Sequence, residues 1–204
     1  MGTRFFSSPG DAPARARTVA SFYGVVLLVG FFWHAISQDT NDVWRVDPDQ
    51  HWITLVWTPL IGVAFGLATV QLFRALEVRM SWLPELHAEF RAIFGRPSGG
   101  EIVLLAATSS LAEEVLFRGA MLDAWGVWVS SIVFALLHIP PKRKLLPWTA
   151  SSFAIGLAFA GLTVWTGNLG AAVAAHFVVN LVNLAYVTRT VPKPTLRGPV
   201  RPGR

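Results

Sequence analysis

The sequence predicts an all-α fold, a polytopic membrane helix bundle of about six transmembrane helices with one interfacial amphipathic helix. The 204 residues are 53% hydrophobic and only 14% charged, whereas soluble domains carry about a quarter charged residues. Apolar runs of about 20 residues, the length that crosses a ~30 Å hydrocarbon core, recur along the chain. Nine Trp and fourteen Phe suit the aromatic belts at the two membrane surfaces.

Each apolar run is assigned to one span in chain order. The run 19–36 follows Arg15 and Arg17, as a signal peptide would, but it lacks a convincing small-residue cleavage site, which favours a retained anchor. Pro140 and Pro141 end the fourth run because they punctuate a helix. The other expected spans are 52–73, a run beginning near Glu101, 125–139, 146–165 and 169–187.

The segment 74–96 has a different pattern and predicts the interfacial amphipathic helix. Its apolar residues recur at roughly helical spacing and charged residues fill the other positions, as in helices that lie on one leaflet. Pro84 marks a break or the start of that helix. An ordinary loop is the alternative for this segment.

Charge alternates from one connection to the next. The two chain ends, the segment 74–96 and residues 142–144 are basic. The intervening connection 39–49 is mainly acidic, and the turns near Asp123 and at 166–170 carry no Lys or Arg. By the positive-inside rule, both termini are expected in the cytoplasm.

Composition also excludes several classes of function. The chain has no cysteine, which excludes disulfides, thiolate metal sites and a cysteine nucleophile. The net charge of +5 does not indicate nucleic-acid binding, because the basic residues lie at the edges of apolar segments rather than in one patch.

Strongly polar side chains within the apolar runs are the main functional signal. An ionisable group at the bilayer centre costs ~3 kcal/mol or more unless it is paired or reaches water. Several of them together therefore require a joint explanation, and catalysis explains them best. They are Glu113, Glu114, Arg118, His138, His176 and Asn180.

Spacing within these residues indicates distinct roles. Glu114 and Arg118 are four residues apart, so on a helix they share a face and can form an ion pair. Glu113 points about 100° away from Glu114, and two carboxylates in different environments can take different roles. His176 and Asn180 also share a face. Histidine relays protons near neutral pH, and asparagine can donate to an oxyanion.

The order Glu-Glu-x-x-x-Arg, Phe-x-x-x-His and His-x-x-x-Asn resembles the CPBP family of intramembrane proteases. That family includes the type II CAAX prenyl endopeptidases and bacterial bacteriocin-processing and immunity proteins. The resemblance covers residues 101–184 and includes Gly161 and the run 166–169 ahead of the last motif. Charge and hydropathy predict a basic cytoplasmic segment 1–18, two spans with the amphipathic segment over 19–100, and a basic disordered tail 188–204; the resemblance implies catalytic helices over 101–187.

The resemblance implies an endopeptidase that hydrolyses a peptide bond near the membrane. Glu113, helped by His138, would activate water. Glu114 and Arg118 would orient the site, and His176 and Asn180 would stabilise the oxyanion. The expected partners are the lipid bilayer and a membrane protein or lipidated peptide substrate, with no nucleic acid. The expected location is the bacterial inner (cytoplasmic) membrane.

The residue types at the site are compatible with a metal centre and with metal-free chemistry. Two glutamates and two histidines could ligate zinc, and a metal would then be held by Glu113, His138 and His176. The sequence has no His-Glu-x-x-His helix, and Arg118 beside the carboxylates disfavours a divalent cation. We therefore expect no metal or other cofactor.

Counting along the helices places Glu113 and His176 in the outer third of the membrane, with His138 about 10 Å nearer the inner side. A site that faces outward is the expectation from this count. It would suit carboxy-terminal sorting or anchor signals of exported proteins as substrates.

Other functions remain as alternatives. A catalytically silent scaffold or bacteriocin-immunity protein would keep the same residues for structure. A serine protease is disfavoured because Ser109 and Ser110 lack a nucleophile elbow. A transporter is disfavoured by the lack of inverted repeats. We interpret His34, His51 and His87 as interfacial or structural.

Overall fold

The computed structural model describes residues 12–47 and 49–190. The long helices are α1 (Ala12–Gln38), α2 (Thr54–Leu76), α4 (Gly99–Glu114), α5 (Leu122–Leu136), α6 (Leu146–Thr166) and α7 (Gly170–Arg189). Shorter elements are α3 (Leu83–Phe94), a π-helix η3 (Val115–Met121), and the 3-10 turns η2 (Glu77–Arg79) and η4 (Arg143–Leu145). The described part contains no β-strand, only an isolated bridge between Arg45 and Asn168. The all-α prediction is confirmed.

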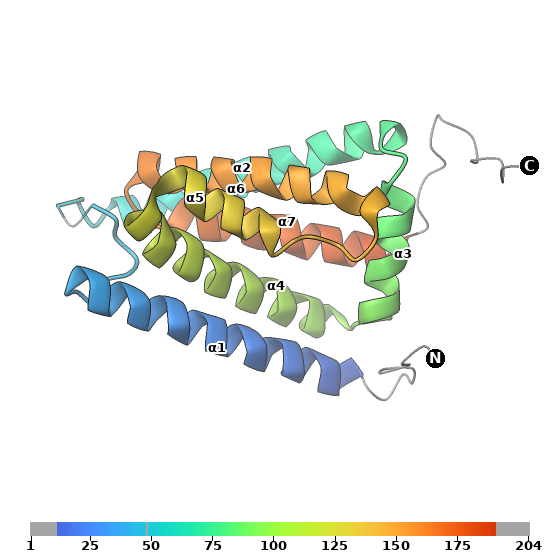
Figure 1. Ribbon diagram of the computed structural model, residues 1–204, viewed down its shortest axis with the longest axis horizontal. Helices are drawn as coiled ribbons and strands as arrows, with labels where there is room; N and C mark the ends of the chain where they lie inside the picture. The colour runs from blue at the N-terminus through green and yellow to red at the C-terminus, as the bar shows by residue number, and fades with distance from the viewer. Residues whose placement is uncertain (1–11, 48, 191–204) are drawn as a thin grey trace, which may run out of the picture.

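Five helical stretches of the described chain are long and apolar enough to cross a membrane. The third, Gly99–Leu136, contains the third and fourth spans expected from the sequence. Gly126 interrupts it with a φ of 78°, and α4 and α5 run in opposite directions (Figure 1). The bundle of about six membrane helices is therefore present. Residues 1–11 and 191–204, most of the two predicted basic ends, lie outside the described residues, and the proposed domain limits stay a prediction.

Small residues bring the helices close together. A Cβ added to Gly62 of α2 would lie 2.1 Å from the carbonyl oxygen of Ala171, and one on Gly66 would lie 2.8 Å from that of Ala175. Such small residues let backbones approach where no hydrophobic effect drives helices together in lipid. They seat α2 directly on α7, and α4 packs between α1 and α7.

The amphipathic segment is shorter than predicted. Helix α2 continues to Leu76, so the first residues of the expected amphipathic helix belong to a membrane span. The reason is tertiary, because Arg74 donates to Asn183 of α7 at 3.1 Å and thereby keeps α2 against α7. Helix α3 begins at Leu83 with Pro84 in its first turn, as Pro84 suggested.

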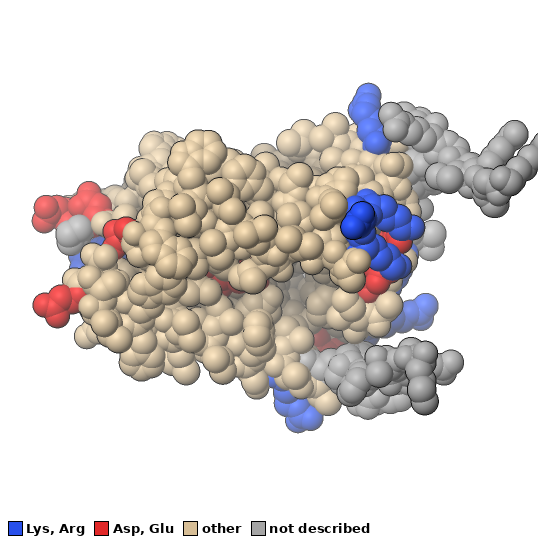
Figure 2. Space-filling model, in the orientation of Figure 1, with Lys and Arg blue, Asp and Glu red and all other residues tan. Residues whose placement is uncertain are grey.

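Helix α3 lies across one end of the bundle (Figure 1). Leu83 and Leu86 pack with Leu145, and His87 is buried. Figure 2 shows most of the visible Lys and Arg at this end, with some Asp and Glu among them, and mainly Asp and Glu at the opposite end. The α3 end is therefore the basic end of the molecule, and the positive-inside rule predicts that it faces the cytoplasm. The sidedness stays a prediction.

Candidate active site

The centre of the site is an ion pair where α4 turns into a π-helix. Glu114 ends α4 and Arg118 lies inside the π-helical segment. Such π-helical turns are rare in proteins, and those that occur are often found at functional sites. Both side chains are completely buried, and Arg118 Nη1 donates to Glu114 Oε1 at 3.0 Å. Arg118 Nη2 donates to the Gly156 carbonyl at 2.9 Å. The predicted pair is present and is anchored to α6.

His176 of α7 connects the two glutamates. Its Nδ1 lies 2.7 Å from Glu114 Oε1, and its Nε2 lies 3.8 Å from Glu113 Oε2. An Nδ1–H that donates to a carboxylate leaves Nε2 as the acceptor in the neutral ring. Glu114 is thus shared by Arg118 and His176. The Oε2 atom of Glu113 is buried and has no hydrogen-bond partner among the described residues.

His138 reaches the site from the turn that follows α5. Its Nδ1 lies 2.7 Å from the Phe134 carbonyl, which fixes this nitrogen as the donor. The Phe134 and Trp148 rings lie 4.5 Å and 5.5 Å from the imidazole centroid. His138 and Glu113 line the same cavity, but no hydrogen bond joins them in the described chain. The histidine with a ring nitrogen within 4 Å of a Glu113 oxygen is His176.

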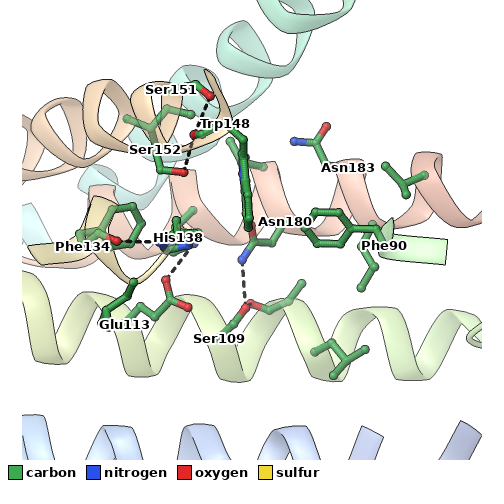
Figure 3. Close-up of a pocket in the computed structure, with 18 of the residues that line it drawn as sticks. Phe90, Ser109, Glu113, Phe134, His138, Trp148, Ser151, Ser152, Asn180 and Asn183 are labelled. Atoms are coloured by element: carbon green, nitrogen blue, oxygen red, sulfur yellow. Dashed lines mark hydrogen bonds and ion pairs between the residues drawn. The ribbon is translucent and has the colours of Figure 1, made fainter. Parts of the chain in front are cut away.

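Asn180 lies one turn beyond His176 and is held from α4. Its Nδ2 donates to Ser109 Oγ at 3.0 Å, and the Ser109 hydroxyl donates to the Ala106 carbonyl at 3.3 Å. Figure 3 shows Ser109 and Glu113 pointing from α4 toward Asn180 and His138. From the sequence, Ser109 was considered only as a possible nucleophile, and Trp148 was not singled out. Neither residue lies in one of the spaced motifs.

These side chains line a cavity of about 590 Å³. From Glu113 and His176 the cavity continues to Trp82 and Phe90 at the α3 end and reaches Arg74. Of the described residues, none between 27 and 72 lines it. The cavity therefore extends from the site toward the basic α3 end, and the side of the membrane that the site faces stays a prediction. Counting along helices gives the depth of a residue, whereas the direction of a cavity depends on where neighbouring helices leave space.

The arrangement does not fit a metal centre. Among the described residues, no group of three or more His, Asp or Glu side chains is placed to hold a metal ion, and this includes the set Glu113, His138 and His176. The nearby Glu114 carboxylate already binds Arg118 and His176. Metal-free chemistry stays a prediction, and no step below uses a metal.

The three histidines that were interpreted as interfacial or structural lie apart from these site residues. His34 is buried on α1, where its Nδ1 contacts the Gly119 carbonyl at 2.7 Å. His51 is exposed beside Trp52, with ring centroids 5.7 Å apart. His87 is buried at the α3 end of the cavity.

Comparison with known proteins agrees with this architecture. The family model for type II CAAX prenyl endopeptidase Rce1-like proteins matches residues 98–182, which include all six candidate residues. "Uncharacterized protein YpbD" of Bacillus subtilis (strain 168) is 31% identical over 160 residues, 75% of this chain and 77% of the relative. No solved structure matches the chain. The chain is thus an integral membrane protein that belongs to the Rce1-like, CPBP-type family of intramembrane proteases.

Proposed function

We propose that the protein is an intramembrane endopeptidase in which Glu113 is the general base. The supporting observation is the unequal use of the two glutamates. Glu114 Oε1 is bound by Arg118 and His176, whereas Glu113 lines the cavity, with its Oε2 3.8 Å from His176 Nε2. A carboxylate that lines the cavity can take a proton from a water molecule there.

The reaction follows from the donors around this carboxylate. Water attacks the carbonyl carbon of the peptide bond, and its proton passes to Glu113. The proton then moves to the leaving amine as the C–N bond breaks, which yields a carboxylic acid and an amine. His138, whose Nε2 remains an acceptor, assists the proton transfer.

The tetrahedral oxyanion needs preorganised donors. When doubly protonated, His176 keeps its Nδ1–H on Glu114 and offers its Nε2–H to the oxyanion. Asn180 uses one N–H on Ser109 and retains the second. Loss of a single donor of this kind typically costs ~3 kcal/mol of transition-state stabilisation. Glu114 and Arg118 act by orienting His176.

The cavity indicates the class of substrate. Its walls toward α3 are mostly apolar and aromatic, which suits a lipid chain or apolar side chains beside the scissile bond. We propose a membrane-anchored or lipidated protein that enters from the α3 end. This direction favours a substrate on the basic side of the membrane over the anchor signals of exported proteins.

The test is peptide cleavage in liposomes that contain the purified protein. The probe is a quenched-fluorescence peptide with a farnesylated cysteine followed by three carboxy-terminal residues. Native membranes from the source organism are followed in parallel for mass changes. Glu113→Gln should abolish product formation. Glu101→Gln is the matched control, because glutamine can keep the capping box with Ser98 at the start of the same helix.

The outcomes separate an enzyme from the silent scaffold. Product from the wild type and Glu101→Gln, with none from Glu113→Gln at equal protein level, supports the proposal. Equal cleavage by Glu113→Gln would refute Glu113 as the base.

A further inference from the structure

The cavity has a second polar region, at its α3 end. Arg74 of α2 and Asn183 of α7 line it there, and Arg74 Nη2 donates to Asn183 Oδ1 at 3.1 Å. The guanidinium carbon of Arg74 lies over the Tyr186 ring, 3.3 Å from its centroid, and this cation–π contact holds the side chain in place. Neither Arg74 nor Asn183 belongs to the residues 98–182 that match the family model.

Hydrogen-bond donors at this end are left over. The Asn183 carbonyl oxygen accepts from Arg74, but its amide nitrogen has no partner among the described residues. His87, which is 3% exposed and lines the same end of the cavity, has an Nδ1 atom that no described residue contacts by a hydrogen bond. Buried polar groups are normally satisfied, so these groups and Arg74 suit a ligand that brings acceptors.

The charges at this end favour an anionic ligand. Glu77 is buried, and both of its carboxylate oxygens accept from the Tyr186 hydroxyl at 3.0 Å. Arg91 of α3 donates to the Val187 carbonyl at 3.5 Å, next to Tyr186 in the chain. None of the ion pairs of the described chain includes Arg74. Around this turn of α7, two arginines therefore face one glutamate.

Helix α7 joins this end to the candidate catalytic residues. His176, Asn180 and Asn183 share a face of the helix, because four and seven residues are close to one and two turns, and all three line the cavity. Figure 3 shows Asn183 beyond Asn180, toward Phe90 of α3. The step from His176 to Asn183 is ~10 Å along the helix, which is about the length of three residues of extended peptide.

We propose that Arg74 and Asn183 bind the carboxy-terminal carboxylate of the substrate. The inference rests on the proposed function, because it takes the bond that is cut to lie at Glu113. A guanidinium matches a carboxylate in charge and in the geometry of its donors, and such charge-assisted hydrogen bonds are strong. The apolar walls at Trp82 and Phe90 lower the local dielectric, which strengthens the attraction. The spacing fits a carboxylate about three residues beyond the cut bond.

The test measures binding and needs no cleavage. The probe is a fluorescent peptide with a farnesylated cysteine and three following residues, and its scissile amide is N-methylated so that it is not cut. It is made with either a free carboxylate or a carboxamide at its end. Anisotropy is recorded with the full chain in phosphatidylcholine nanodiscs, and the signal from empty nanodiscs is subtracted. The wild type should bind the carboxylate form about 10–100-fold more tightly, as expected for hydrogen bonds to a charged group.

Two variants alter this region in different ways. Arg74→Gln removes the charge but keeps a donor for Asn183. Asn183→Asp keeps the acceptor for Arg74 and adds a carboxylate that repels the one on the probe. Both should abolish the preference for the carboxylate form and leave binding of the carboxamide form unchanged. Arg79→Gln is the matched control and should keep the full preference, because Arg79 is exposed and does not line the cavity.

The outcomes decide between a carboxylate site and other roles. Equal binding of the two forms by the wild type would overturn the proposal and leave the region to another anion, such as a lipid phosphate. A preference that survives both variants would overturn it as well. If Arg74→Gln weakened binding of both forms alike, Arg74 would be structural and the proposal would fail.

Length and turnover give two further readouts. A probe with six residues after the cysteine should show no preference, because its carboxylate would extend beyond Arg74; an undiminished preference would refute the spacing. In the peptidase assay, the carboxamide form of the cleavable peptide should raise KM with kcat nearly unchanged. Cleavage that persists in Glu113→Gln would refute the proposed function alone, because the preference is measured on a probe that is not cut.

Discussion

Substitution of Arg118 by methionine tests how the site is held together. The change removes the guanidinium from Glu114 and from the Gly156 carbonyl, both of which it contacts at about 3 Å inside a fully buried environment. Breaking a buried ion pair by removing one partner costs about 3–5 kcal/mol, because an uncompensated charge remains. His176 still contacts Glu114, so we expect a loss near the lower bound.

The assay is the free energy of unfolding of Arg118→Met, measured in lipid bicelles by steric trapping. Arg45→Met is the control, because Arg45 pairs with Asp42 at the surface, with the two side chains about one-third exposed. Such pairs contribute about 0–1 kcal/mol. The double variant Glu114→Gln/Arg118→Met should recover part of the lost stability, since it removes the stranded carboxylate, yet it should remain inactive. Arg118→Met as stable as Arg45→Met would refute the reasoning.

Two further predictions concern helix packing and pH. Gly62→Ala should lower the free energy of unfolding by about 1–3 kcal/mol, because the added Cβ would meet the Ala171 backbone. Gly24→Ala is the control and should leave the free energy of unfolding unchanged, because open space surrounds Gly24. Equal melting temperatures for the two variants would contradict this prediction. Burial lowers the pKa of His87 below its usual 6.5, so the folded state favours the neutral ring. Stability should be complete above pH 6.5 and fall as the pH drops below it. Thermal unfolding between pH 7.5 and 5 checks this, and His87→Gln should weaken the dependence; an unchanged slope would argue against His87.

Much of the site is visible in the sequence because its signals are local. Span lengths follow from the thickness of the bilayer. The pairing of Glu114 with Arg118, and the common face of His176 and Asn180, follow from the four-residue spacing of a helix. The start of α3 follows from Pro84. Each of these depends on neighbours within one or two turns.

The amphipathic segment and the direction of the cavity were harder to predict. The extension of α2 into the predicted amphipathic segment is accompanied by the contact of Arg74 with Asn183, which are 109 residues apart. The cavity extends toward α3 because of how separate helices pack, which no count along one helix contains. The conversion of α4 into a π-helix over Val115–Met121 likewise left no recognised signal in the chain.

By itself, the sequence determined the all-α membrane architecture and the six polar residues that belong together. Tertiary structure alone decided that His176 rather than His138 is the histidine with a ring nitrogen within 4 Å of a Glu113 oxygen. Hydrophobic length and helical spacing are properties of one segment. Contacts of α1 with the π-helix and of α2 with α7 depend instead on how closely the helices approach, which Gly30 and Gly62 set by permitting backbone contact.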